Sequence, residues 1–268
     1  MSNNNIANTN SSPMPTKSRF EALKQNKPLY QGIIFVLVIG ITIAIIVMIK
    51  NLIVYLYRQK MRRPWIIKGS KDAKKSLVVA QDPADPNSVP LNRSDNESGG
   101  TEFTYSLWMV VDNFVYNKDK WKHVFHKGSN PPYPNRAPGV YLHPNKNSLR
   151  IYMNTYEKIL DYVDIDNIPV RKWIHLAIVL REKIFDIYVN GTLKKRHVFS
   201  SLPRQNFGDL WVNLNGGFEG YLSNMRYYQY ALNYNDIEDI VSNGPSDDTC
   251  GDSKDLPGYL NDRWWIKN

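Results

Sequence analysis

The hydrophobic positions of this chain form two different patterns, and the first is a continuous apolar run. Gly32–Ile49 comprises eighteen residues without a charged side chain, and Leu52–Tyr57 extends the apolar character. At about 1.5 Å per residue, roughly 20 residues cross a hydrocarbon core about 30 Å thick. The run has no polar face, so the alternative, a buried core helix, would need other segments to surround it. We therefore predict a transmembrane helix over residues 30–57, uncleaved because about thirty polar residues precede a run too long for a signal peptide.

The second pattern begins at Thr101 and consists of short runs that alternate apolar and polar positions. Examples are EFTYSLWMVV, SLRIYM and KWIHLAIVL, which are separated by turn sequences such as NPPYPN, HPNKN and NG. About ten such strands predict an all-β fold, an antiparallel β-sandwich (jelly roll) over residues 101–245. Asn190–Gly191 is typical of a hairpin turn. One short helix is predicted over Tyr234–Ser242, with Asn233 or Asn235 as its N-cap.

The remaining segments are mostly polar. Residues 1–29 are rich in Asn, Ser and Pro, which predicts a disordered tail. Residues 58–100 are predicted to be a basic junction and linker, in which Leu77–Ala80 is an apolar exception that fits an edge strand. Residues 246–268 form a C-terminal tail with adjacent Trp264 and Trp265. Large apolar rings are costly to leave in water, so the two either fold back onto the sandwich or dock on a partner.

Nearly all excess positive charge lies on one side of the apolar run. The chain has a net charge of +9, residues 50–75 hold nine cations against one acid, and residues 76–268 hold 21 cations against 23 acids. The positive-inside rule places the large domain on the cytoplasmic side. A nucleic-acid partner is not indicated, because the folded domain has no basic excess. The cluster at the junction either attracts anionic lipid headgroups or acts only as a topology signal; its members are Arg58, Lys60, Arg62, Arg63 and Lys68.

Three motifs in the second half of the chain carry a family resemblance. They are a W-x-H-x-A strand, an aromatic-x-N-G hairpin, and a late strand that begins with G-x-L and leads through Ala-Leu to a short helix. The combination resembles the laminin-G-like branch of the concanavalin A-like lectin/glucanase superfamily. The resemblance implies a domain that binds proteins or glycans. The matching residues are Trp173, His175, Ala177, Tyr188, Asn190, Gly191, Gly220, Leu222, Met225, Tyr227, Ala231 and Leu232.

A narrower resemblance concerns the sequences YSLW, WKHVFHKG and PGVYL and the closing tail PGYLNDRWW. They are similar to membrane-anchored minor virion proteins of large nucleocytoplasmic DNA viruses. This resemblance implies a structural protein that tethers the internal viral membrane to the capsid, with the bilayer and capsid or other virion proteins as partners and the sandwich facing the capsid. The alternative is a lectin-like membrane protein whose aromatic side chains stack on glycans, with Tyr133, Tyr141, Tyr227 and Tyr228 as candidates.

No catalytic or cofactor motif is present, so we expect no enzyme activity. Glycoside hydrolysis needs two facing carboxylates, and the strand most similar to the E-x-D-x-x-E strand of the glucanase branch carries only Asp186.

Metal-binding patterns are weak. Asp161, Asp164 and Asp166 are calcium candidates, with a solvated strand end as the alternative. His123 and His126 are expected on opposite faces of a strand, which does not suggest zinc. His175 is expected to be packed and bonded to backbone. Cys250 is the only cysteine, which fits a domain outside an oxidising lumen.

Overall fold

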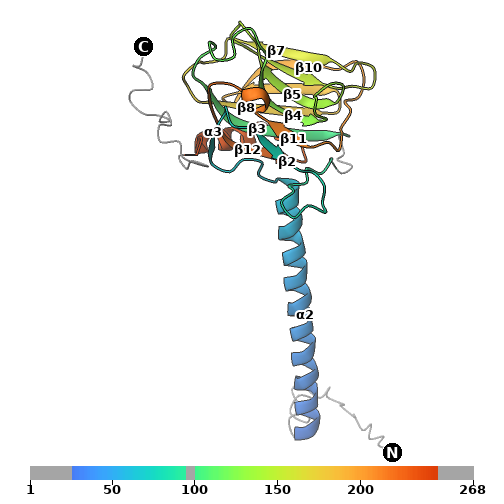
Figure 1. The fold of residues 1–268 in the computed structure, drawn as a ribbon. Helices are drawn as coiled ribbons and strands as arrows, with labels where there is room; N and C mark the ends of the chain where they lie inside the picture. Colours follow the sequence, from blue (N-terminus) through green and yellow to red (C-terminus); the bar gives the residue numbers. More distant parts are fainter. Residues whose placement is uncertain (1–25, 95–99, 247–268) are drawn as a thin grey trace, which may run out of the picture. The chain divides into compact units, whose positions relative to one another are not determined.

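The structure, a computed structural model, describes residues 26–94 and 100–246. The chain divides into two units between Tyr57 and Arg58. The first unit is helical, and the second is a β-sandwich with a short helix packed on it (Figure 1). The predicted architecture, an antiparallel sandwich preceded by a long apolar helix, is confirmed.

Helix α2 extends from Lys27 to Arg62 and has 36 residues, which corresponds to about 54 Å at 1.5 Å per residue. Its side chains from Lys27 to Arg58 are exposed, and by length and composition it could cross a membrane. The helix is longer than the predicted span of residues 30–57. The added C-terminal residues include Arg, Gln, Lys and Met, which are good helix formers, so the helix does not end where the apolar run ends.

The sandwich consists of two six-stranded sheets whose neighbouring strands are all antiparallel. We call them sheet A and sheet B. The strands of sheet A, in spatial order, are β1 (Ser70–Asp72), β12 (Gly220–Tyr228), β3 (Glu102–Val111), β8 (Ile174–Arg181), β9 (Ile184–Val189) and β10 (Thr192–Val198). The strands of sheet B are β2 (Leu77–Val79), β11 (Leu210–Val212), β4 (Lys122–Gly128), β5 (Arg136–Leu142), β6 (Ser148–Met153) and β7 (Asp161–Asp166).

The alternation of β3 explains how the layers form. Leu107 and Met109 face the core between the sheets, whereas Trp108 and Val110 face outward and pack with Trp173. Both faces of this central strand are therefore buried, which is unusual for an antiparallel sheet with one solvated side.

Helix α3 (Tyr234–Asn243) closes the outer face of sheet A. Asn233 is its N-cap, and a reciprocal pair of side-chain bonds with the backbone joins Asn233 and Asp236 as a capping box. Ile237 packs against the outward-facing Ala177 and Val179 of β8. The predicted helix is confirmed, and of the two N-cap candidates Asn233 holds the position.

Residues 62–79, expected to belong to a linker, are part of the sandwich. The backbone N–H groups of Ile66 and Ile67 both donate to the carbonyl of Met225, at 2.9 and 3.0 Å, and both side chains are buried. Strands β1 and β2 follow, and β2 confirms the edge strand predicted at Leu77–Ala80. The sequence gives little indication that these residues pair with the sandwich, because each paired stretch has only two or three residues and is too short to show a hydrophobic period.

The register of the strands defines two ends of the sandwich. At one end, which we call the Arg62 end, the carbonyl of Arg62 accepts a hydrogen bond from the Gln229 N–H just beyond β12. The described connections at this end are residues 80–94, 100–101, 129–135, 154–160, 182–183, 199–209 and 229–233. The opposite end, which we call the Asn190 end, carries residues 73–76, 112–121, 143–147, 167–173, 190–191 and 213–219.

Candidate binding surface

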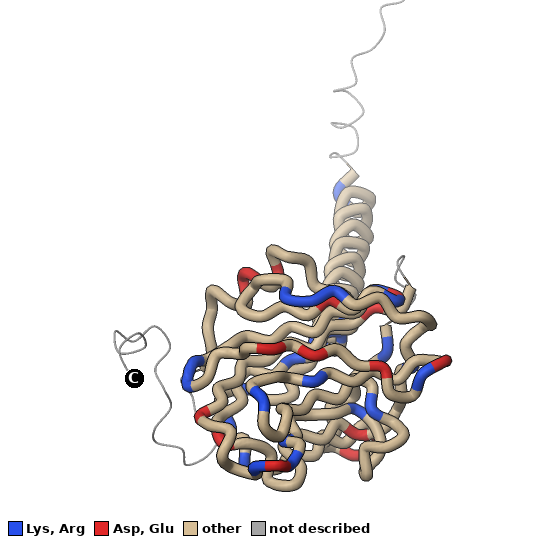
Figure 2. Tube along the Cα trace, turned by 90° about the horizontal axis from the view of Figure 1, so that it is seen from above, with Lys and Arg blue, Asp and Glu red and all other residues tan. Residues whose placement is uncertain are grey.

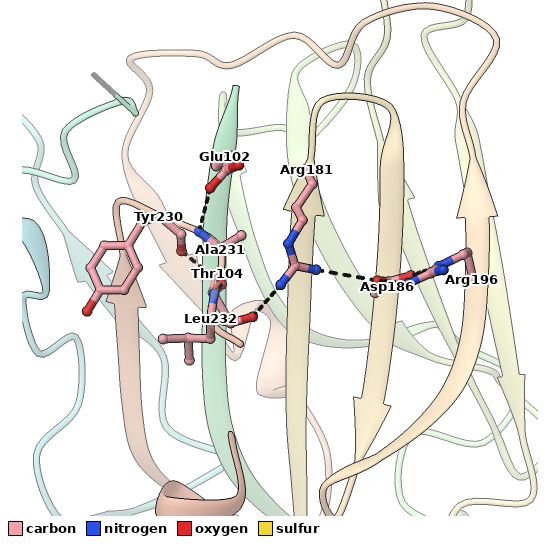
Figure 3. A network of polar contacts seen from close by, with 8 residues as sticks. All are labelled: Glu102, Thr104, Arg181, Asp186, Arg196, Tyr230, Ala231 and Leu232. Atoms are coloured by element: carbon pink, nitrogen blue, oxygen red, sulfur yellow. Dashed lines mark hydrogen bonds and ion pairs between the residues drawn. The ribbon is translucent and has the colours of Figure 1, made fainter. Parts of the chain in front are cut away.

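The outer face of sheet A is closed by a polar network that joins β3, β8 and β9 to the segment before α3 (Figure 3). Thr104 donates its hydroxyl to the Tyr230 carbonyl at 3.0 Å and accepts the Leu232 N–H at 3.0 Å. Arg181 donates to the Leu232 carbonyl at 2.6 Å. The network fixes the approach of α3, so this face is a packing surface.

Asp186 is the outward-facing acid of β9, and its carboxylate forms ion pairs with two arginines. Its side chain is 1% exposed; Arg196 binds both of its oxygens, at 2.6 and 2.8 Å, and Arg181 approaches within 3.5 Å. A carboxylate whose two oxygens are both bound by arginine is not free to deliver a proton or attack a sugar. The acid on the strand that most resembles a glucanase strand therefore has a structural role.

The outer face of sheet B carries a row of alternating arginine and aromatic side chains, which we call the sheet B ladder. The Arg150 guanidinium lies 4.0 Å from the ring centre of Tyr162 and 5.0 Å from that of Trp121. Arg136 lies 3.7 Å from the ring centre of Tyr152. Trp121 and Tyr162 are 41% and 45% exposed, so the ladder is open to solvent.

An ion pair fixes the centre of the ladder. Arg150 on β6 binds Asp164 on the neighbouring β7 through two parallel hydrogen bonds of 2.7 Å each. The pair holds the guanidinium plane between the aromatic rings, where it combines ionic and cation–π attraction. Sequence reasoning missed this site, although the alternation in SLRIYM and DYVDID places Arg150, Tyr152, Tyr162 and Asp164 on one face.

His123 and His126 lie beside the ladder and form a directional hydrogen-bond chain. Leu214 donates its N–H to His123 Nδ1 at 3.0 Å, so the proton of neutral His123 resides on Nε2 and is donated to His126 Nδ1 at 2.7 Å. His126 in turn donates from Nε2 to the Ser129 carbonyl at 2.9 Å. Burial, reinforced by the neighbouring His126, lowers the pKa of His123 to about 3, and burial also lowers the pKa of His126.

The expectation that these histidines face opposite sides of a strand is wrong. The β4–β5 register shifts between His123 and Phe125, which marks a β-bulge. The extra residue lets Val124 and Phe125 both enter the core and brings both histidines to one face. A bulge of this kind has no period-two signature in the sequence.

A cleft of about 510 Å³ opens at the Asn190 end, between the end of β7 and the β9–β10 hairpin. Asp166 and Lys194 contribute charges of opposite sign, and Asn167 and Thr192 contribute further polar groups. Two of its lining residues, Asn167 and Asn190, have positive φ values of 57° and 50°. The remaining lining residues are Ile165, Ile168, Pro169, Val189 and Asn190.

The three calcium candidates on β7 do not converge. Asp161 lies 3.3 Å from His197 Nε2, Asp164 is paired with Arg150, and Asp166 lines the cleft. Asp161 and Asp164 are three residues apart on a strand and point to opposite faces. Within residues 26–94 and 100–246, no group of three His, Cys, Asp or Glu side chains is placed to hold a metal ion.

The members of the predicted basic cluster differ in their surroundings. Arg58, Lys60, Arg63 and Lys68 are exposed. Arg62 is half-buried, with its guanidinium 5.3 Å from the ring centre of Tyr230. Trp264 and Trp265, predicted to dock or fold back, lie outside the described residues.

The tyrosines considered for glycan stacking are mostly inside the sandwich. Tyr227 packs in the core, Tyr228 is covered on sheet A, and Tyr141 is 7% exposed, so none of the three presents a ring face of the size that stacking needs. Tyr133, in the β4–β5 connection, is 60% exposed.

His175 is packed as expected, but its partner is a side chain. Its Nε2 lies 2.8 Å from the Ser106 hydroxyl on the neighbouring β3. Burial lowers the pKa of His175 to about 3.

Comparison with known protein families gives one match. Residues 85–238 match the Laminin_G_3 family model, described as the concanavalin A-like lectin/glucanases superfamily. The chain belongs to this superfamily. The laminin-G-like sandwich therefore accounts for more than half of the chain, and the resemblance drawn from Trp173, Asn190 and Gly220 is confirmed at the level of the superfamily. No curated protein matches the sequence.

Solved structures similar to the laminin-G-like sandwich include domains of botulinum neurotoxins. The receptor-binding domain of the C/D mosaic serotype is 12% identical with a TM-score of 0.45, covering 53% of this chain and 36% of that one. The serotype D ligand-binding domain in complex with N-acetylneuraminic acid is 11% identical with a TM-score of 0.47, covering 67% and 51%. The serotype G binding domain is 12% identical with a TM-score of 0.45, covering 65% and 46%. The chain thus spans about a third to a half of the length of these structures.

Proposed function

We propose that this protein is a membrane-anchored, non-enzymatic tether whose laminin-G-like sandwich binds a protein partner through the sheet B ladder. In the setting that the narrower sequence resemblance implies, α2 lies in the internal membrane of a virion and the partner is a capsid or other virion protein. The observation that carries the proposal is the open row of Trp121, Arg136, Arg150, Tyr152 and Tyr162 on one sheet face.

The residue types of the ladder support a protein partner. Trp, Tyr and Arg are the side chains enriched among the few residues that dominate protein interfaces. They are already held in place by Asp164 and by one another, so little side-chain entropy is lost when a partner binds. Cations and acids are interspersed along the strands of the sandwich (Figure 2), which favours a specific protein surface over a polyanion.

The ladder is tested with the full chain carrying Trp121→Ala and Tyr162→Ala. Both side chains are exposed, so the fold is retained, and each removed anchor is expected to cost about 2 kcal/mol, roughly 30-fold in affinity. The readout is recovery of the capsid shell protein with the chain after particles are opened with detergent. Tyr234→Ala, 60% exposed on α3, is the matched control. Equal recovery for the variant and the control would refute the ladder as the binding site.

The topology of the tether is tested separately by protease protection in sealed microsomes. The excess of cations after residue 49 predicts that the sandwich is digested from the outside, as a cytoplasmic domain would be. A protected sandwich contradicts the capsid-facing orientation.

A glycan-binding function is the second candidate, and the cleft at the Asn190 end is the observation that favours it. A volume of about 510 Å³ lined by Asp166, Asn167, Thr192 and Lys194 offers both acceptors and donors to a sugar. A glycan array distinguishes the two functions. Reproducible binding of one defined sugar that is lost in Asp166→Ala supports the lectin, and an array without binding leaves the protein tether.

A further inference from the structure

Exposed apolar side chains are distributed unevenly over the two ends of the laminin-G-like sandwich. The connections at the Arg62 end carry six of them, with exposed fractions from 44% to 74%: Tyr133, Tyr156, Ile159, Leu160, Leu202 and Phe207. On the described connections at the Asn190 end, side chains of this kind are Val115 and Trp121. Single exposed apolar residues need no explanation, but a collection on one end marks an interaction surface.

The loops that present these side chains are held together by hydrogen bonds. The Tyr156 N–H donates to the Leu202 carbonyl at 3.1 Å, and the Arg204 N–H donates to the Asn154 carbonyl at 2.8 Å. The connections 154–160 and 199–209 therefore form one supported surface, with Tyr156 and Leu202 adjacent on it. Because these hydrogen bonds hold the two loops in place, the loops cannot fold inward to bury their exposed apolar side chains.

Arginines lie beside the most exposed rings at this end. Arg204 lies 5.6 Å from the ring centre of Tyr156, and Arg93 lies 4.2 Å from that of Phe207. This pairing of an aromatic ring with a cation suits the boundary between lipid headgroups and acyl chains. Asp82, Asp85 and Glu157 lie on the same connections, so apolar burial supplies the attraction and net charge does not.

Chain connectivity ties one corner of this end to the predicted membrane span. The apolar run ends at Tyr57, and the Arg62 carbonyl is already bonded to Gln229 at the Arg62 end. Five helical residues span only about 7.5 Å. The chain enters this end at the β12 edge of sheet A, and connection 199–209 begins at β10, four strands further along the same end.

We infer that the Arg62 end of the sandwich docks on the lipid bilayer, with the side chains of connections 154–160 and 199–209 inserted among the headgroups. The docking rests on the proposed membrane anchor and deepens it. The anchor holds the chain to the membrane, and the docked end fixes the sandwich against it. The Asn190 end and the adjoining part of the sheet B ladder, with Trp121 and Arg150, stay available to the partner.

The experiment measures lipid contact residue by residue in the full chain reconstituted in phosphatidylcholine nanodiscs. Cysteine is introduced by Leu202→Cys, Phe207→Cys or Val115→Cys in a Cys250→Ser background, because Cys250 is the only native cysteine. Each is labelled with a small fluorophore, and quenching by headgroup-nitroxide lipid is recorded. Ile46→Cys, quenched by acyl-chain nitroxide, reports insertion of α2 independently.

Docking predicts strong quenching at residues 202 and 207 and weak quenching at residue 115, at the opposite end. When Leu160→Ser and Tyr156→Ser are introduced into the labelled chains, each is expected to lower the ratio of docked to free sandwich about tenfold. Burial of one such apolar side chain changes an equilibrium constant by about a factor of ten. High salt and added phosphatidylserine are expected to change the ratio little.

Two failures are distinguishable. Quenching at residue 46 with equal, weak signals at residues 115, 202 and 207 overturns the docking alone and leaves the membrane anchor standing. An unquenched residue 46 overturns the membrane anchor itself. Unchanged quenching in the Leu160→Ser and Tyr156→Ser variant also overturns the docking, because the signal would then not depend on the apolar surface.

Discussion

Mild acid is predicted to unfold the laminin-G-like sandwich, because three histidines are buried in the neutral form. His123 and His175 have their pKa values lowered to about 3, and burial also lowers the pKa of His126. In the unfolded chain a histidine titrates near 6.5. Above pH 6.5 both states are neutral and stability is complete. Between pH 6.5 and about 3 the unfolded chain binds protons that the fold does not, so stability falls as pH falls.

The magnitude follows from the number of protons. Each neutral buried histidine removes about 1.4 kcal/mol of stability per pH unit, so His123 and His175 together remove about 2.7 kcal/mol per unit. Between pH 6.5 and 4.5 the loss is about 5 kcal/mol, comparable to the whole stability of an ordinary domain. His126 acts in the same direction. Asp112 opposes it, because burial and the nearby Glu219 raise the pKa of that carboxyl.

The assay is urea unfolding of the full chain in detergent, followed by tryptophan fluorescence at half-unit steps from pH 7 to 4.5. The control is His175→Gln, which keeps a hydrogen-bonding group near Ser106 but cannot be protonated. It is expected to lower stability at pH 7 and to reduce the pH slope by about 1.4 kcal/mol per unit. A flat profile above pH 4.5, or an unchanged slope in the variant, would refute the reasoning.

Three further predictions concern stability at neutral pH, each measured as the change in the urea midpoint. Asn233→Ala removes the capping box of α3 and is expected to cost about 1 kcal/mol, whereas Asn243→Ala at the other end of the helix costs less. Asp186→Ala is expected to cost about 2–3 kcal/mol, because it deletes the buried carboxylate and its charge-assisted hydrogen bonds with Arg196. Asp186→Asn should recover part of this loss. A loss below about 0.5 kcal/mol for Asp186→Ala would contradict a packing role for the network. Gly191→Ala is expected to cost about 1–2 kcal/mol, because φ is +77° and the new Cβ would collide with Glu238 Oε1; Glu238→Ala should restore part of the loss.

Elements with a long, regular period were predictable from the sequence. The apolar run, the alternation of β3 and the capped α3 each repeat a local signal over many residues. The contribution of residues 62–79 was not predictable, because it depends on backbone hydrogen bonds to β12 that any short sequence can make. The pairing of His123 with His126 was missed for a different reason. It requires a bulge, and a bulge shifts the face of every following side chain.

The sheet B ladder was predictable only in part. Its alternation within β6 and β7 is visible in the sequence, but the meeting of Arg150 with Trp121, which belongs to the connection before β4, depends on the order β4-β5-β6-β7. Strand order in an antiparallel sandwich is set by long-range pairing, which local patterns do not specify. The residues of this surface come from three strands and the connection before β4, so each can be noted in the sequence but their assembly into one surface cannot.

The two proposed surfaces overlap only in part, because the sheet B ladder extends from Trp121 at the Asn190 end to Arg136 and Tyr162 at the Arg62 end. Strand β3 has 10 residues, and at about 3.3 Å per residue it separates the Arg62 end from the Asn190 end by about 30 Å. Trp121 belongs to the Asn190 end and Arg150 lies near the start of β6 at that end, whereas Tyr156 and Leu202 belong to the other. A sandwich whose Arg62 end is in the headgroups would keep Trp121 and Arg150 well clear of them. Loss of partner binding in Trp121→Ala should therefore leave lipid quenching at residue 207 unchanged, and coupling between the two would mean that both readouts report a single surface.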